Sequence, residues 1–208
     1  MEEPIEFLRR QEDAELNVKD AMVDLVRVVC QGDYMTGFLQ FCVTNLHQYQ
    51  AEQADWRIKE AILLLVGRMA DRIRSEFSSM VEPMMMEHVV PETQSPDSYL
   101  KYRAIWFYGQ FSGIKFQNMQ HVHQVLDILF QSLYIDQLPL KVAAFTSLYK
   151  FLNGNEEAQA FLRPGLSDLL TIYLKIMDEY DNEELILGLE QLIGYYKEEM
   201  EPFTLQLV

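Results

Sequence analysis

Cysteine, glycine and proline are all scarce in this chain of 208 residues, which contains 2, 9 and 7 of them. Two cysteines do not make the disulfide framework of a small secreted domain. Cys30 and Cys42 both stand within apolar helical patterns, so we expect them to be buried free thiols. Because helix breakers are few and no stretch alternates apolar and polar residues over many positions, the sequence predicts an all-α fold.

Positive charge is also in short supply. The chain has 17 Lys and Arg against 32 Asp and Glu, which gives a formal net charge of −15. Such a surface repels phosphate backbones and anionic lipids, so we expect basic protein partners and no direct binding of nucleic acid. Apolar runs such as 61–66 and 142–145 are far too short to cross a bilayer, and the acidic start Met1-Glu2-Glu3 is unlike a signal peptide. No contact with a membrane is therefore expected, and the chain is expected to be soluble and intracellular.

Small residues recur in the chain at nearly constant intervals. They lie 40, 43, 40 and 44 positions apart, at Ala21, Ala61, Ala104, Ala144 and Gly188. In every case the next residue and the fourth one on are apolar, as on one face of a helix. A small residue lets a neighbouring helix approach closely, so each unit is suited to pack on a copy of itself. Two-helix repeats of this length are typical of HEAT and armadillo proteins; a non-repetitive helical domain is the alternative.

We therefore predict an α-α superhelix, a HEAT-repeat solenoid of about four and a half helical hairpins in a single array. Each small residue falls on the second helix of its hairpin, which lines the concave side in HEAT solenoids. In the first hairpin a short helix over 4–10 is expected to pair with a helix over 15–30. Asp55 and Asp97 are expected to be N-caps, and Pro83 and Pro164 to kink or divide their helices. The predicted units are 1–33, 34–75, 76–112, 117–153 and 155–199, with the start of a further helix at 201–208.

Three charged residues occupy equivalent places on successive second helices. Asp20, Glu60 and Arg103 each lie one position before a marked small residue, and the pattern ends at the uncharged Ala143. Equivalent places on stacked repeats form a ladder. The three side chains are candidates either for a polar strip along the concave wall or for ties between adjacent repeats.

An acidic turn is the second candidate site. Five carboxylates, from Asp178, Glu179, Asp181, Glu183 and Glu184, crowd the connection between the two helices of the last complete unit. One interpretation is a solvated turn whose charges favour the start of the following helix. The other is an electrostatic docking patch for a basic protein such as a histone or a ribosomal protein.

No pattern in the sequence indicates catalysis, a cofactor or a metal. Phosphate-binding glycine loops and nucleophile elbows are absent. His121 and His123 are two positions apart on a predicted helix and point in different directions, and no further ligand follows at metal-binding spacing. His47 and His88 stand alone in the sequence, so ordinary polar or partly buried positions are expected for them.

Four segments carry a resemblance to a known family. They are DWRIKEAILLLVGRMA at 55–70, YRAIW at 102–106, LPLKVAA at 138–144 and DNEEL at 181–185. In their residues, order and spacing they resemble the importin-β superfamily of nuclear transport receptors, and within it the importin seven and importin eight branch. The resemblance covers most of the chain, which is about a fifth as long as such a receptor, and both ends are expected to be cut from a longer array.

The resemblance implies a central segment of a karyopherin that shuttles between cytoplasm and nucleus through the nuclear pore. Such a receptor binds protein cargo without bond chemistry. RanGTP would be bound by a part of the parent chain outside this segment, and the phenylalanine-glycine repeats of nucleoporins by shallow grooves between convex helices. Two alternatives stay open: a HEAT scaffold for a phosphatase or a trafficking complex, and a helical enzyme.

Overall fold

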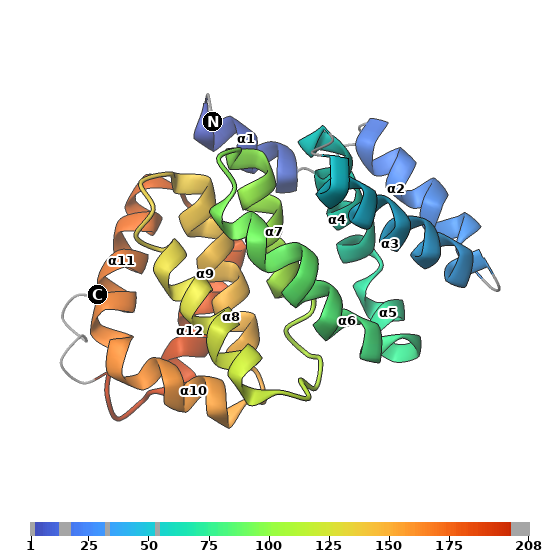
Figure 1. Cartoon of the computed structure of the whole chain (residues 1–208). Helices are drawn as coiled ribbons and strands as arrows, with labels where there is room; N and C mark the ends of the chain where they lie inside the picture. Colours follow the sequence, from blue (N-terminus) through green and yellow to red (C-terminus); the bar gives the residue numbers. More distant parts are fainter. Residues whose placement is uncertain (1–2, 13–17, 32–33, 53–54, 201–208) are drawn as a thin grey trace.

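The computed structural model describes residues 3–12, 18–31, 34–52 and 55–200, and all of the regular secondary structure in them is helical (Figure 1). The predicted all-α solenoid is confirmed. The elements are α1 Pro4–Glu12, α2 Val18–Val29, α3 Tyr34–Glu52, α4 Trp56–Arg68, α5 Ala70–Glu76, α6 Ser78–Met84, the π-helix η1 Met85–Val89, the 3-10 helix η2 Val90–Gln94, α7 Ser98–Gln110, α8 Met119–Ser132, α9 Leu138–Leu152, α10 Glu156–Leu162, the 3-10 turn η3 Arg163–Gly165, α11 Leu166–Glu179 and α12 Glu183–Tyr195.

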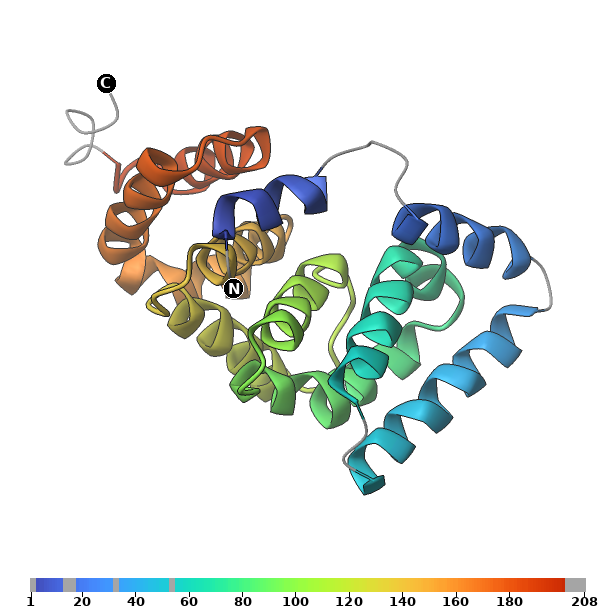
Figure 2. The same ribbon diagram turned by 90° about the horizontal axis from the view of Figure 1, so that it is seen from above.

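One row of helices runs along the array, and each helix in it packs on its neighbours. In it α4 packs on α7, α7 on α9, and α9 on α12, while α3 and α8 pack against α4 and α9 from the other row. Seen from above, the helices follow an arc from α12 round to α2 (Figure 2). The core runs along this row, and nearly every residue of α9 is buried.

Asparagine or aspartate side chains cap the N-termini of α4, α7, α8 and α12. Asp55 accepts a hydrogen bond from the backbone N–H of Arg57 at 3.0 Å, and Asp97 accepts from those of Tyr99 and Leu100 at 2.9 and 3.1 Å. Each side chain satisfies donors that the first helical turn leaves unpaired. Both predicted N-caps are thus confirmed.

Proline interrupts two of the predicted helices. Pro83 lies inside α6, and the chain passes directly from that helix into the π-helix η1. Pro164 lies in the 3-10 turn η3, which separates α10 from α11. Proline lacks the N–H that continues the α-helical ladder, so both changes in helix type fall where the sequence predicts them.

The close approaches between helices fall only partly at the marked small residues. Ala104, Ala144 and Gly188 are buried, whereas Ala21 and Ala61 are exposed, so the prediction is wrong for those two. In α4 the close approach is made by Gly67 instead, where an added Cβ would lie 2.4 Å from the ring of Trp106. Helix α4 is turned so that a different small residue faces α7.

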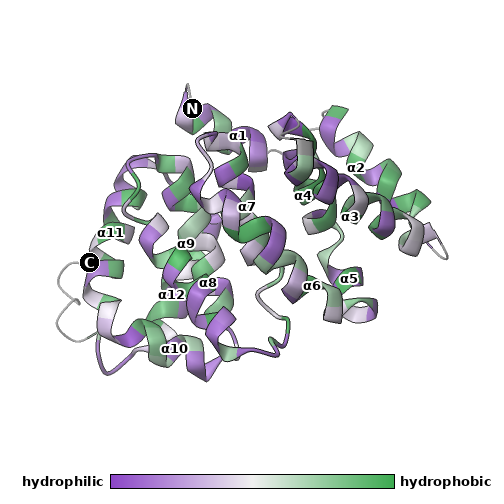
Figure 3. Ribbon diagram, in the orientation of Figure 1, coloured by the Kyte–Doolittle hydropathy of each residue, from purple (hydrophilic) through white to green (hydrophobic). Residues whose placement is uncertain are grey.

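Helix α2 leaves an apolar stripe uncovered. Its exposed residues follow a spacing of three or four, as on one helical face. The helix is marked in Figure 3, where colour gives hydropathy. Among the described residues no helix covers this stripe, which consists of Val18, Met22, Leu25 and Val29.

Helix α1 does not pair with α2 as expected but packs against α9. Leu8 is only 1% exposed there, and the ring of Phe7 meets that of Tyr102 edge-on at 4.9 Å. Figure 2 shows α1 on the inner side of the arc, well apart from α2. The first hairpin therefore lacks its predicted partner helix, and the other unit boundaries stay predictions. The predicted helix start at 201–208 lies outside the described residues.

Both cysteines match expectation. Cys30 and Cys42 are buried and free, and burial raises the pKa of the Cys42 thiol to about 12, with Cys30 adding to the effect. Within the described part of the chain, no helix is both long enough and apolar enough to span a bilayer.

The packing of α7 on α9 allows a matched test of a glycine. A Cβ at Gly109 would lie 2.7 Å from Oγ and 3.0 Å from Cα of Ser147, whereas nothing lies within 4 Å of one at Gly194. Both are the last residue but one of their helices, α7 and α12. We expect Gly109→Ala to lower the free energy of unfolding by about 1–3 kcal/mol through overpacking. Gly194→Ala should raise it by up to about 1 kcal/mol. Urea denaturation of both variants measures this, and equal effects would contradict the close contact.

Candidate functional site

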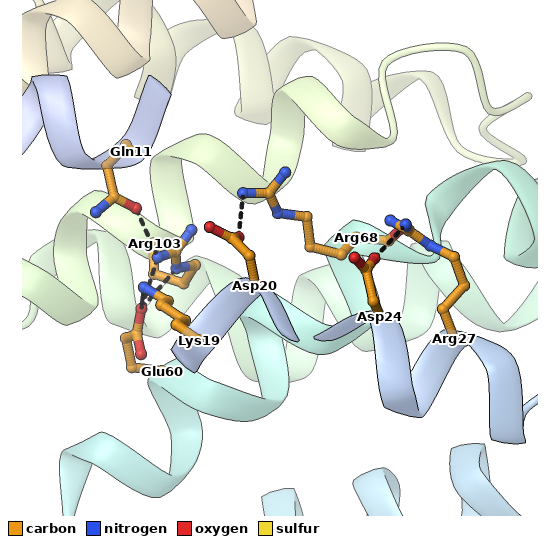
Figure 4. Close-up of polar contacts among 8 residues, drawn as sticks. All are labelled: Gln11, Lys19, Asp20, Asp24, Arg27, Glu60, Arg68 and Arg103. Atoms are coloured by element: carbon orange, nitrogen blue, oxygen red, sulfur yellow. Dashed lines mark hydrogen bonds and ion pairs between the residues drawn. The ribbon is translucent and has the colours of Figure 1, made fainter. Parts of the chain in front are cut away.

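A buried arginine is at the centre of the polar cluster on the inner face of the array (Figure 4). Arg103 of α7 is 2% exposed. Its Nη2 and Nε lie 2.7 and 2.8 Å from Oε1 of Glu60 in α4, and its Nη2 donates to Oε1 of Gln11 in α1 at 3.3 Å. The arginine thereby joins three helices that are far apart in the sequence.

Aromatic rings and a lysine complete the surroundings of Arg103. The guanidinium carbon lies 4.7 Å from the ring centre of Trp106, a distance typical of a cation–π contact. On the other side, Nζ of Lys19 in α2 lies 3.9 Å from the same Glu60 oxygen. Desolvation and then the charge of Arg103 lower the pKa of Lys19. Two cations share one carboxylate here, and Arg103 holds the nearer place.

Asp20 lies beside this cluster but pairs elsewhere. Its Oδ1 is 3.5 Å from Nη2 of Arg68 in α4. One turn further along α2, Arg27 contacts Asp24 at 2.8 Å and donates to the carbonyl oxygen of Arg68 at 3.3 Å. Of the three ladder candidates, the structure brings Glu60 and Arg103 together and leaves Asp20 on a parallel link between α2 and α4. Except for the Arg27–Asp24 pair within α2, these contacts join neighbouring helices of the array.

The inner face is also hollowed. A hollow of about 440 Å³ opens between the C-terminal halves of α4, α7 and α9, and a smaller one of about 210 Å³ adjoins it beneath α1. We call the larger one the inner hollow. The residues that line it include Arg27, Arg68, Arg74, Gln110, Lys150, Asn153 and Gln191.

The cations around the inner hollow all have carboxylate partners. Arg68 pairs with Asp20, Arg74 with Asp71, and Lys150 with Glu184. The sequence analysis missed this polar lining, although a signal was present: Arg68, Gln110 and Lys150 stand seven, six and six positions after Ala61, Ala104 and Ala144. Because its charges are compensated, the inner hollow is a polar surface rather than a strongly positive one.

In contrast to the inner hollow, the acidic turn between α11 and α12 carries charges that are mostly uncompensated among the described residues. Asn182 caps α12 by accepting from the N–H groups of Glu184 and Leu185 at 2.6 and 3.2 Å. Glu184 turns inward to Lys150 and accepts a hydrogen bond from the hydroxyl of Tyr149 at 3.3 Å. The other four candidates are exposed, and within the described residues no cation pairs with them: Asp178, Glu179, Asp181 and Glu183.

The histidines separate into two groups. His121 faces Glu82 at 2.7 Å and His123 faces Glu157 at 2.8 Å, so the two point to different helices as expected. His47 and His88, which are isolated in the sequence, are neighbours in space with ring centres 5.1 Å apart.

Comparison with known proteins finds relatives whose names all refer to importins. No family model and no solved structure matches the chain. It is 29% identical over 218 aligned residues to the importin beta-like SAD2 homolog of Arabidopsis thaliana, and 26% identical over 217 to the probable importin-7 homolog of Dictyostelium discoideum. Each alignment covers 99% of this chain, but 21% and 20% of the relative. Human importin-8 is 26% identical over 70% of the chain and 14% of its own length.

The resemblance to the importin-β superfamily, and within it to the importin seven and eight branch, is thereby confirmed. The chain spans about a fifth of the length of the first two relatives.

The pair of Glu60 and Arg103 allows a test of how the array is held together. Replacing Glu60 by Gln leaves a buried guanidinium without its counter-charge. Since Glu60 keeps some solvent contact, with its side chain 19% exposed, we expect a loss of about 2–3 kcal/mol of unfolding free energy, less than for a fully buried pair.

The matched control is Glu76→Gln. It removes an exposed i,i+4 pair with Arg72 at 3.0 Å and should cost less than about 1 kcal/mol. Chemical denaturation of both variants measures the difference. A loss for Glu60→Gln no greater than for the control would mean that the pair does not tie α4 to α7.

Proposed function

We propose that this chain, similar along nearly its whole length to importins, is a HEAT-repeat segment of a nuclear transport receptor that recognises basic protein cargo. Recognition is by surface complementarity, with no bond chemistry. The parent receptor would shuttle between cytoplasm and nucleus under the control of RanGTP, bound by a part of the chain outside this segment. Phenylalanine-glycine repeats of nucleoporins are proposed partners of the same receptor.

The observation that carries the cargo proposal is the acidic turn. Asp178, Glu179, Asp181 and Glu183 crowd one short connection, are exposed and have no cationic partner among the described residues. Exposed, uncompensated charge of one sign raises the rate of encounter with a partner of the other sign. Basic proteins such as histones and ribosomal proteins have the charge that this patch would attract.

The inner face is a poorer site for a basic partner than the acidic turn. The cations of the inner hollow are already compensated by Asp20, Asp71 and Glu184, and α1 lies over the smaller neighbouring hollow. A basic partner would gain little there, because it would have to displace existing ion pairs. The turn offers carboxylates that no cation occupies. We therefore assign cargo contact to the turn and a structural role in joining adjacent repeats to Asp20, Glu60 and Arg103.

The proposal predicts a position-specific loss of binding. The quadruple variant Asp178→Asn, Glu179→Gln, Asp181→Asn, Glu183→Gln should bind a lysine-rich histone roughly tenfold or more weakly at low salt, because four exposed pairs act together. Fluorescence anisotropy with a labelled histone tail measures the affinity, and the wild-type affinity should fall as salt rises.

The control removes the same amount of charge elsewhere. Asp127, Glu156, Glu190 and Glu198 are also exposed, on α8, α10, α12 and the turn after α12. Changing these four to Asn or Gln should leave binding within about twofold, because they are dispersed. If both quadruple variants lose affinity equally, binding reflects net charge alone and the turn is not a docking patch. Stable capture of enzyme subunits by the wild-type chain, with no basic protein, would favour the scaffold alternative.

A further inference from the structure

Three side chains with metal-binding atoms converge between α3 and η1. Nε2 of His47 lies 3.5 Å from Oε1 of Glu87, and Nε2 of His88 lies 3.9 Å from the same oxygen. One ligand atom from each residue can be chosen so that all three lie within 4.8 Å of one another. His47 comes from α3, whereas Glu87 and His88 are adjacent in η1.

The repeat explains this meeting. His47 and His88 are 41 positions apart, about one repeat length, so they occupy equivalent places in successive predicted units. Glu87 and His88 lie in a π-helical turn that follows Pro83, and such turns are frequent at functional sites. Gln50 donates to the backbone oxygen of Glu87 at 3.0 Å and so fixes the π-helical turn against α3.

One ring nitrogen of His88 is buried and lacks a hydrogen-bond partner among the described residues. The atom is Nδ1, and the residue is 2% exposed. A buried polar atom that lacks a partner is costly. An ion held by Nδ1 meets the need for a partner directly, whereas an ion held by Nε2 leaves it to a water. His47 and Glu87 are exposed and leave the cluster accessible to an ion from solvent.

We propose that His47, Glu87 and His88 form a binding site for a divalent transition-metal ion, and that zinc is the ion it takes. Two imidazoles and one carboxylate are a ligand set that zinc accepts, with solvent in the fourth position. Tetrahedral bonds of about 2.0–2.1 Å place neighbouring ligand atoms roughly 3.3 Å apart. The two Nε2 atoms lie 3.5 and 3.9 Å from the Glu87 oxygen, and the three ligand atoms lie within 4.8 Å of one another, so the exposed His47 side chain must move toward His88 to complete the site.

Lys59 is the nearby cation that would repel an ion. Its ammonium is buried against Glu92 at 2.6 Å, which compensates its charge.

A bound ion would join two successive units of the array. It would link α3 directly to η1 across a boundary where Gln50 and the His47–Glu87 pair already make polar contact. Zinc binding to the folded chain would then stabilise it against unfolding, because the unfolded chain lacks the assembled ligands.

The test is titration of the untagged chain with zinc chloride by calorimetry, together with thermal unfolding with and without zinc. We expect one ion per chain and a higher melting temperature. His47→Gln and Glu87→Gln, both at exposed positions, should weaken zinc binding at least about tenfold, since even loss of an outer partner costs that much in metal sites. The increase in melting temperature should disappear with them.

The matched control is His123→Gln. This histidine is exposed to a similar degree and also faces a glutamate, Glu157 at 2.8 Å, but belongs to no group of three ligands in the described chain. It should keep wild-type affinity. Equal affinity in wild type and in the His47 and Glu87 variants would assign the zinc to scattered surface carboxylates and overturn the proposal. The absence of any measurable zinc binding by the wild-type chain would overturn it as well.

Discussion

The fold depends above all on the close contact of α7 with α9. Gly109 brings its backbone against Ser147, and Oγ of Ser147 donates to the backbone oxygen of Ile105 at 2.9 Å, a buried bond between the two helices. With α4 on one side and α12 on the other, this contact makes a continuous buried row. The row presents its turns at one edge and its polar inner face to the interior of the arc. Each proposed site takes its position from this row or from the helices stacked against it.

Charge is distributed unevenly over the array, and this distribution separates structural from binding roles. On the inner face every cation that we have described, from Arg103 to Lys150, has a carboxylate within contact distance. The pairs of Arg103 with Glu60, Arg68 with Asp20 and Lys150 with Glu184 join neighbouring helices. At the turn before α12 the excess carboxylates have no such partners in the part of the chain that the structure describes. In a chain of net charge −15, location and pairing distinguish a docking patch from general acidity better than the total does.

The sequence predicted the features that depend on local chemistry. The helical class, the N-caps Asp55 and Asp97 and the interruptions at Pro83 and Pro164 follow from neighbours a few residues away. The predictions that were wrong concern how helices are oriented in the tertiary structure. They are the burial of Ala61, which the rotation of α4 exposes, and the pairing of α1 with α2, since α1 packs on α9. The candidate residues could be predicted only in part. The repeat interval places Glu60 near Arg103 and His47 near His88. It did not predict that Asp20 pairs with Arg68 or that Glu184 pairs with Lys150, because the repeat fixes positions along the array and not side-chain orientations.

Hydrogen–deuterium exchange of the chain with and without a bound lysine-rich histone tests the central claim most directly. The account predicts new protection in the backbone around 178–185, with the inner face of α4, α7 and α9 unchanged. Protection that appears instead along Arg68, Gln110 and Lys150, with the acidic turn unaffected, would contradict it. Cargo would then enter the inner hollow and displace the ion pairs that we assign to structure.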